Sequence, residues 1–153
     1  MKIIVACTEN RVIGCKGKIP WYCPEDMKLF RKLTKWHYVL MGRKTWDSLP
    51  IRPLKNRYSI VLSSNVIEYP KNKDTTFIKN LDEVKAIWNY ILCIGGGAVY
   101  KEVLDKGLVD EIWMSVMKKE YDGDVWFPEL SSKWHVTERG SYDEFEFRRL
   151  KCS

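Results

Sequence analysis

Short apolar runs rich in β-branched residues alternate with segments of helical spacing over the first two thirds of this chain. Strands are predicted at Lys2–Cys7, Tyr38–Met41, Tyr58–Leu62, Thr76–Ile78 and Ile91–Ile94. Helices are predicted at Pro24–Thr34, Arg43–Leu49, Leu81–Trp88 and Ala98–Leu104. Strands that alternate with helices form βαβ units, so this pattern predicts an α/β fold built on a mostly parallel sheet.

The last third of the chain differs, because three strand patterns follow one another without a helix between them. They lie at Glu111–Lys118, Trp134–Thr137 and Glu144–Leu150. Consecutive strands favour antiparallel pairing, which predicts an antiparallel addition at one edge of the sheet. The 153 residues show no internal repeat and no linker, and 45% are hydrophobic, so we expect a single domain over residues 1–153.

The charge of the chain limits the classes of partner. The net charge is +6, but the basic residues are dispersed and the longest basic runs are pairs. This favours small anionic ligands over nucleic acid. The apolar run at residues 3–6 is too short for the core of a signal peptide, and no stretch is long enough to span a membrane. We therefore expect neither a nucleic-acid partner nor a membrane.

The cysteines and histidines form no metal-binding pattern in the sequence. The five cysteines are an odd number, none belongs to a Cys-x-x-Cys pair, and the two histidines add no ligand cluster. The cysteines are Cys7, Cys15, Cys23, Cys93 and Cys152. Free thiols in a reducing cytoplasm, with no bound metal, are the expectation.

The helix predicted from Pro24 carries an acid on its apolar face. Pro24 suits the first helical position, so Asp26 falls in the first turn. Phe30 and Leu33 follow at helical spacing and share a side of the helix with Asp26. One interpretation is a partly hydrated first-turn acid that the helix dipole stabilises. The other is a functional acid at the mouth of an apolar pocket, where desolvation raises its pKa for proton transfer.

Ligands of open α/β sheets bind at the carboxyl ends of the strands, and three such ends here suit phosphate. Met41 precedes a glycine, two cations and a hydroxyl at a helix start, a combination that either binds phosphate or caps a helix. Ile94 precedes three glycines, which lose more backbone conformational entropy on folding than other residues. Their presence therefore indicates either the close approach of a pyrophosphate or a sharp turn. Leu62 precedes two serines, which are common both in phosphate or ribose sites and in turns.

Two phosphate-type strand ends and a semi-buried acid together suggest a dinucleotide and an uncharged ring that receives a proton. The glycines do not match the Gly-x-Gly-x-x-Gly fingerprint, and the following strand runs into Lys118 and Lys119 before any acid that could hold a ribose. A standard Rossmann domain is therefore disfavoured. The features favour a reductase, with hydride from a cofactor and a proton from an acid or water.

A larger set of residues, in order along nearly the whole chain, matches a known family. The set is Val12-Ile13-Gly14, Pro20-Trp21, Pro24-x-Asp26-x-x-x-Phe30, Met41-Gly42-Arg43-x-Thr45-Trp46, Leu54, Arg57, Leu62-Ser63-Ser64, Ile94-Gly95-Gly96-Gly97-x-Val99-Tyr100 and Gly123-Asp124-x-x-Phe127-Pro128. Together these motifs resemble dihydrofolate reductase. The resemblance implies an eight-stranded, mostly parallel sheet with an antiparallel C-terminal edge, flanked by about four helices in one α/β domain. It also implies NADPH-dependent reduction of 7,8-dihydrofolate to 5,6,7,8-tetrahydrofolate in one-carbon metabolism, by a cytoplasmic monomer that antifolates would inhibit.

The resemblance also implies roles for individual residues. Asp26 would hydrogen-bond the amidine-like edge of the pterin and promote protonation of N5, directly or through a water that Trp21 helps to hold. Ser115 would stand behind the acid, and Arg57 would pair with the α-carboxylate of the glutamate tail. The remaining substrate contacts would come from backbone groups of Ile4 and Val5 and from an apolar pocket of Met27, Phe30, Leu49, Leu54 and Ile94. The NADPH contacts would come from Ala6, Ile13, Gly14, Arg43, Lys44, Thr45, Leu62, Ser63, Ser64, Lys79, Gly95, Gly96, Gly97, Ala98, Val99 and Tyr100.

The chain departs from the family pattern at several positions. Ser115 stands where a threonine is usual but keeps the hydroxyl, so we expect its hydrogen bond to Asp26 to persist. Ala98 stands where a basic residue is common, and Lys79 is the candidate to supply charge to the 2′-phosphate instead. The loop from Glu9 to Lys18 resembles the mobile lid that closes over the cofactor.

Two other functions stay open at this point. A pyrimidine reductase of riboflavin synthesis shares the fold and NADPH, but it lacks the Pro-Trp pair and the pocket acid that Trp21 and Asp26 supply here. A non-catalytic folate- or nucleotide-binding protein is compatible with the same residues, because a fold does not determine activity. Oxidation of NADPH with and without dihydrofolate discriminates between catalysis and binding.

Overall fold

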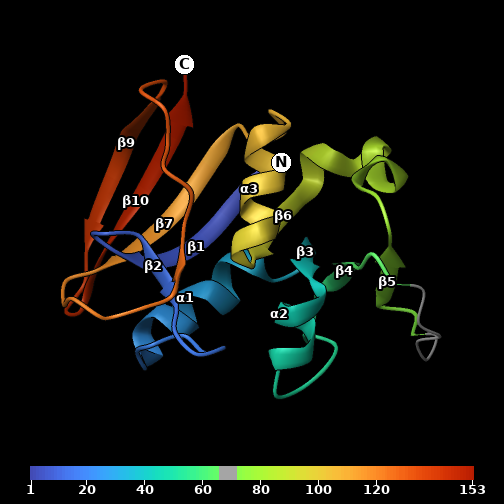
Figure 1. Ribbon diagram of the computed structural model, residues 1–153, viewed down its shortest axis with the longest axis horizontal. Coiled ribbons are helices and arrows are strands. Elements are labelled where there is room, and N and C mark those ends of the chain that lie inside the picture. Colours follow the sequence, from blue (N-terminus) through green and yellow to red (C-terminus); the bar gives the residue numbers. More distant parts are fainter. Residues whose placement is uncertain (66–71) are drawn as a thin grey trace.

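The structure, a computed structural model that describes residues 1–65 and 72–153, is built on an eight-stranded sheet (Figure 1). Its strands are β1 (Lys2–Thr8), β3 (Tyr38–Gly42), β4 (Tyr58–Leu62), β5 (Thr75–Ile78), β6 (Ile91–Gly95), β7 (Glu111–Met117), β9 (Trp134–Ser141) and β10 (Phe145–Cys152). The short strands β2 (Val12–Gly14) and β8 (Val125–Trp126) pair with each other in a second sheet. The helices are α1 (Pro24–Thr34), α2 (Arg43–Ser48), α3 (Gly97–Asp105) and the 3-10 helix η1 (Leu81–Tyr90).

The strand order of the main sheet is β5-β4-β3-β6-β1-β7-β10-β9, so the N-terminal strand lies in the interior of the sheet. The pairs from β5 to β7 are parallel, whereas β10 is antiparallel to both β7 and β9. In Figure 1, β9 and β10 form one edge of the sheet and β5 lies at the other. The predicted α/β fold with an antiparallel C-terminal edge is confirmed.

The two faces of the sheet are covered by different helices. Val99 and Val103 of α3 belong to the largest core cluster, together with Val5 of β1. Phe30 of α1 packs instead against Ile4, the neighbour of Val5. Because successive side chains of a strand point to opposite faces, α3 and α1 lie on opposite sides of the sheet. Within residues 1–65 and 72–153, no helix is long and apolar enough to cross a membrane.

Two segments differ from the elements that the sequence predicts. The segment Leu81–Tyr90 forms a 3-10 helix that non-helical backbone at Val84 interrupts, with Asn80 and Glu83 as a capping box at its start. The loop after β1 contains β2, which pairs with β8. Strands of two or three residues are too short to show a period in sequence, so only their pairing in space reveals them.

Candidate active site

Asp26 lies in the first turn of α1, after Pro24 at the start of the helix. Further along the same face, Phe30 and Leu33 pack against a cluster that includes Ile4 of β1. The Asp26 side chain is partly buried at the N-terminal end of this apolar stripe. The face that Asp26 shares with Phe30 and Leu33 is therefore the inward face, as the helical spacing predicts.

Ser115 of β7 supplies the hydrogen-bond partner of Asp26. Ser115 is only 6% exposed and lies between Trp113 and Met117, whose side chains belong to the two apolar clusters beneath α1. Burial raises the pKa of Asp26 above its ordinary value, and the hydrogen bond with the Ser115 side chain opposes part of this rise. The site thus contains a desolvated carboxyl group that is easier to protonate than an ordinary aspartate.

Five of the predicted substrate residues form a continuous apolar wall beside this acid. Phe30 packs with Ile4 and Ile94 in one cluster, and Ile94 also packs with Leu49 and Leu54 in another. Ile94, at the end of β6, therefore connects α1 to the segment that follows α2. A planar aromatic ligand in contact with this wall would bury apolar surface on binding.

Two predicted substrate residues lie apart from the wall. The Met27 side chain is 46% exposed. The Val5 side chain points into the core beneath α3, on the opposite face of the sheet, so only its backbone can face a ligand at the wall. The neighbouring carbonyl oxygen of Ile4 accepts a hydrogen bond of 2.7 Å from the Tyr100 hydroxyl. That bond, unforeseen from the sequence, ties the first turn of α3 to β1.

Arg57 is held in place by backbone and hydroxyl groups. Its Nη1 donates to Thr34 Oγ1 at 3.1 Å, and its Nε donates to the Lys55 carbonyl oxygen at 2.9 Å. Burial lowers the pKa of Arg57, and the nearby positive charge of Arg31 lowers it further. These contacts orient the guanidinium without neutralising it. Thr34, which sequence patterns did not identify, is fully buried at the end of α1 and also donates to the Phe30 carbonyl oxygen.

The three phosphate-type strand ends lie next to one another at the carboxyl edge of the sheet. Met41 is paired in register with Gly95, and Gly42 is paired with Leu62. Ser63 donates its backbone N–H to the Ile78 carbonyl oxygen at 2.9 Å, and Lys79 follows directly after β5. The structure therefore brings the ends of β6, β3, β4 and β5 into one row, as an extended dinucleotide would require.

Three of the glycines in this row are explained by packing within the chain. A Cβ atom at Gly42 would lie 2.9 Å from Val99 Cγ2, and one at Gly97 would lie 2.9 Å from Val125 Cγ1. Gly95 has a φ of +116°, and a Cβ there would meet the Tyr100 ring at 3.2 Å. Gly96 differs, because a Cβ there would meet only Thr45 Oγ1, at an ordinary 3.4 Å. Gly96 is thus the glycine whose backbone remains open to a ligand.

The side chains around the row supply cations and hydroxyl groups. Arg43 donates from Nε to the Asp47 carboxylate at 2.9 and 3.1 Å, while Lys44 is exposed. Ser63 is buried and Ser64 exposed. Ala98 is exposed at the start of α3 and adds no charge. Positive charge at this edge therefore comes from α2 and from the end of β5.

The loop that carries Ile13 and Gly14 lies against the glycine turn before α3. The ideal Cβ position of Gly97 is 3.7 Å from Ile13 Cδ1. Asp124, just before β8, secures the loop at two points, because its N–H donates to the Gly14 carbonyl oxygen at 3.0 Å and its Oδ2 accepts from the Lys16 N–H at 3.0 Å. This role of Asp124 had no local signal beyond its place in a family-type motif.

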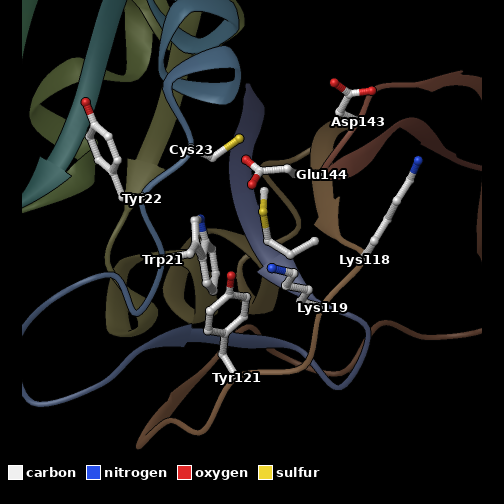
Figure 2. Close-up of a pocket in the computed structure, with 9 residues that line it drawn as sticks. Trp21, Tyr22, Cys23, Lys118, Lys119, Tyr121, Asp143 and Glu144 are labelled. Atoms are coloured by element: carbon white, nitrogen blue, oxygen red, sulfur yellow. The ribbon is translucent and has the colours of Figure 1, made fainter.

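Trp21 precedes α1 and packs in the same apolar cluster as Ala6. Its ring lies 5.3 Å from the Tyr121 ring, at the wall of a cavity of about 120 Å³ (Figure 2). Figure 2 shows Cys23 and Glu144 pointing toward each other beside Trp21. None of the predicted substrate-binding side chains lines this cavity, so it is separate from the apolar wall.

A family model described as dihydrofolate reductase matches residues 1–153. The chain belongs to the dihydrofolate reductase family. A dihydrofolate reductase from Haemophilus influenzae is 36% identical over 162 residues, which cover 98% of this chain and 92% of the relative. A dihydrofolate reductase from Staphylococcus aureus is 32% identical over 147 residues, which cover 94% of this chain and 89% of the relative. Family membership confirms the resemblance drawn from the motifs and the expectation of an oxidoreductase with a nucleotide cofactor.

Proposed function

We propose that this chain reduces 7,8-dihydrofolate to 5,6,7,8-tetrahydrofolate with NADPH as the cofactor. The single observation that carries the proposal is the partly buried carboxyl group of Asp26, which lies on the inward face of α1 at one end of an apolar wall. An acid in this environment can bind the polar edge of a heterocycle whose flat faces lie against apolar side chains.

The role proposed for Asp26 is to hydrogen-bond the amidine-like edge of the pterin and to promote protonation of N5, directly or through water. Desolvation favours the protonated acid and Ser115 stabilises the ionised one, and the net result is a pKa above the ordinary value, which makes the acid easier to protonate. Trp21, which packs with Ala6 and Leu29 before and beneath the start of α1, would help to hold the water beside the acid. Ile4, Phe30, Leu49, Leu54 and Ile94 would exclude water from the rings, and Met27 would contact them from the rim.

The role proposed for Arg57 is to bind the α-carboxylate of the glutamate tail. A guanidinium donates two parallel hydrogen bonds to a carboxylate, and that geometry requires the side chain to be oriented in advance. The contacts with Thr34 and Lys55 provide this orientation while the charge stays available.

The residues present fit a phosphate-bearing cofactor, which supplies the hydride when bound. Gly96 leaves its backbone accessible beside the Thr45 hydroxyl, so a pyrophosphate can approach closely there. The remaining contacts proposed for NADPH come from the backbone of Ala6, Gly95, Gly97, Ala98 and Val99, from Ile13, Gly14 and Tyr100, and from the adenosine-side residues Arg43, Lys44, Leu62, Ser63, Ser64 and Lys79. Lys79 is the proposed partner of the 2′-phosphate.

The experiment that tests the proposal follows the absorbance of NADPH with purified protein, with and without dihydrofolate. We expect oxidation that depends on dihydrofolate, and slower oxidation of NADH. Absence of oxidation with either cofactor, together with tight binding of folate, would instead indicate a non-catalytic binding protein. Inhibition by an antifolate that competes with dihydrofolate is expected at the same site.

We further propose that the enzyme acts as a monomer in the cytoplasm. The five cysteines are unpaired, as expected in a reducing compartment. Light scattering of the purified protein, and fractionation of cells that produce it, test these two expectations.

A further inference from the structure

A network of ion pairs joins the loop after β1 to the C-terminal strands. Glu9 directly follows β1, and its Oε1 lies 2.7 Å from Nη2 of Arg148 on β10. Arg148 Nε lies 2.6 Å from Oε1 of Glu146, which also accepts from Arg139 Nη1 at 2.6 Å. Arg148 therefore holds two carboxylates at once, and one of them is 139 residues away in the sequence.

Arg148 is the most enclosed member of this network. Its side chain is 22% exposed, compared with 66% for Glu9 and 55% for Arg139. Burial alone would lower the pKa of Arg148, but the hydrogen bonds to Glu9 and Glu146 raise it above its ordinary value. The guanidinium is thus a fixed charge, whereas Arg139, the cross-strand partner of Arg148 on β9, makes its ion pair with Glu146.

A tight turn connects Glu9 to the loop that faces the proposed cofactor site. The Arg11 N–H donates to the Thr8 carbonyl oxygen at 2.9 Å, and the Val12 N–H donates to Thr8 Oγ1 at 3.0 Å. These bonds close a turn around Glu9 and Asn10, so Glu9 lies directly between β1 and β2. Ile13 is the next residue of β2 and lies against Gly97.

We propose that Arg148 is a positioning residue for cofactor binding, which acts by holding Glu9 and thereby placing Ile13 against Gly97 at the start of α3. The inference rests on the proposed function, because NADPH is the ligand whose affinity it changes. Ion pairs at a protein surface contribute little to overall stability. The expected signature is therefore weaker cofactor binding with little change in Tm.

The experiment compares the Kd of NADPH, measured by quenching of tryptophan fluorescence, in the wild type and in R148M, E9Q, the double variant and R139M. We expect R148M and E9Q each to raise the Kd by about two- to fivefold. The double variant should be no weaker than either single variant, since all three lack the same ion pair. R139M is the matched control, and its Kd should equal that of the wild type.

Limited trypsin digestion gives a second measurement that needs no cofactor. Lys16 and Lys18 are exposed in the loop, so cleavage there reports how firmly the loop is held. Cleavage should be faster in R148M and E9Q than in the wild type, and unchanged in R139M. If R148M does not fold, E9Q alone tests the proposal, because Glu9 is exposed and its substitution leaves the core intact.

An unchanged Kd and an unchanged cleavage rate in E9Q would overturn the proposal, as would equal losses in R148M and R139M or additive losses in the double variant. Failure of the proposed function has a different result, in which the wild type itself does not bind NADPH. In that case the cleavage rates still test whether Arg148 holds the loop, and the inferred effect on NADPH affinity falls together with the proposed function.

Discussion

The proposed substrate side and the proposed cofactor side of this chain are built from different parts of the polypeptide. On the substrate side, side chains present the chemistry: Asp26 supported by Ser115, Arg57 supported by Thr34, and an apolar wall. On the cofactor side, the binding groups are backbone groups at the ends of neighbouring strands. Gly96 is the position there whose backbone is open to a ligand.

This difference determines how each side tolerates substitution. A functional group on the substrate side is lost when one side chain is shortened or neutralised, and the scaffold remains. On the cofactor side an added Cβ does the damage, because packing within the chain already occupies the space at Gly42, Gly95 and Gly97. The following predictions test this contrast.

Replacement of Asp26 by asparagine should have the largest effect, a fall in kcat of about 10²- to 10³-fold at neutral pH, because it removes the acid but keeps the shape. Activity should partly recover at low pH, where the substrate is already protonated. Steady-state assays across pH provide the measurement. Glu25→Gln is the control, since Glu25 is the exposed neighbour in the same helical turn. Full activity of Asp26→Asn at neutral pH would remove Asp26 from the mechanism.

Arg57→Ala should raise the KM for dihydrofolate by about 10- to 100-fold, the effect of losing hydrogen bonds between charged groups. A pterin that lacks the glutamate tail should lose little affinity. Arg57→Lys should be only partly effective because it keeps the charge without the planar fork. The exposed Lys55→Ala variant should resemble the wild type. Equal losses for substrates with and without the tail would contradict the assignment.

Gly97→Ala should weaken NADPH binding by about tenfold and lower stability, because its new Cβ would lie 2.9 Å from Val125 Cγ1. Adding Val125→Ala should restore most of the lost stability by removing that methyl group. Gly96→Ala should retain more stability than Gly97→Ala while still weakening NADPH binding. Titration with NADPH and thermal unfolding separate the two effects. Normal cofactor affinity in Gly96→Ala would show that the substrate and cofactor sides do not differ as described.

Ser115→Ala should move the pH profile by a smaller amount. The hydrogen bond from Ser115 lowers the pKa of Asp26, so its removal raises that pKa. If the protonated acid is the active form, the alkaline fall in kcat moves to higher pH. Ser115→Thr keeps the hydroxyl and should keep the wild-type profile. An unchanged profile in Ser115→Ala would exclude Ser115 from the tuning of the acid.

The smallest expected effect is a gain in stability of a few degrees in Tm when Asp26 is replaced by asparagine. Burial raises the pKa of Asp26 in the folded state above its ordinary value of 3.8, so the folded state binds more protons than the unfolded state just above that pH. Stability falls as the pH rises through this window, and the loss persists at pH 7. The gain in Asp26→Asn should therefore be present at pH 7 and disappear below about pH 3.8. A Tm gain that does not depend on pH would point to packing instead.

The position of Asp26 on an apolar helical face could be predicted because helical spacing is a local property. The partner of that acid, Ser115, followed from the family resemblance and from no local pattern, since it comes from β7 and the parallel pairing of β1 with β7 places it beneath α1. The contact between Arg57 and Thr34 could not be predicted, since they meet across 23 residues of sequence. Strands β2 and β8 were missed for a related reason, as each is too short to carry a pattern and their pairing spans the chain.

The sequence by itself determined the strand and helix pattern, the acid on the inward face of α1 and the family to which the chain belongs. Periodicity and glycine content reflect local backbone preferences, so the elements that they predict can be identified without knowledge of tertiary contacts. Only the tertiary structure decided which glycines serve internal packing, that Val5 faces away from the apolar wall, and that Arg148 holds Glu9. These outcomes depend on distances between residues far apart in the sequence, and the packing of the sheet and its helices sets those distances.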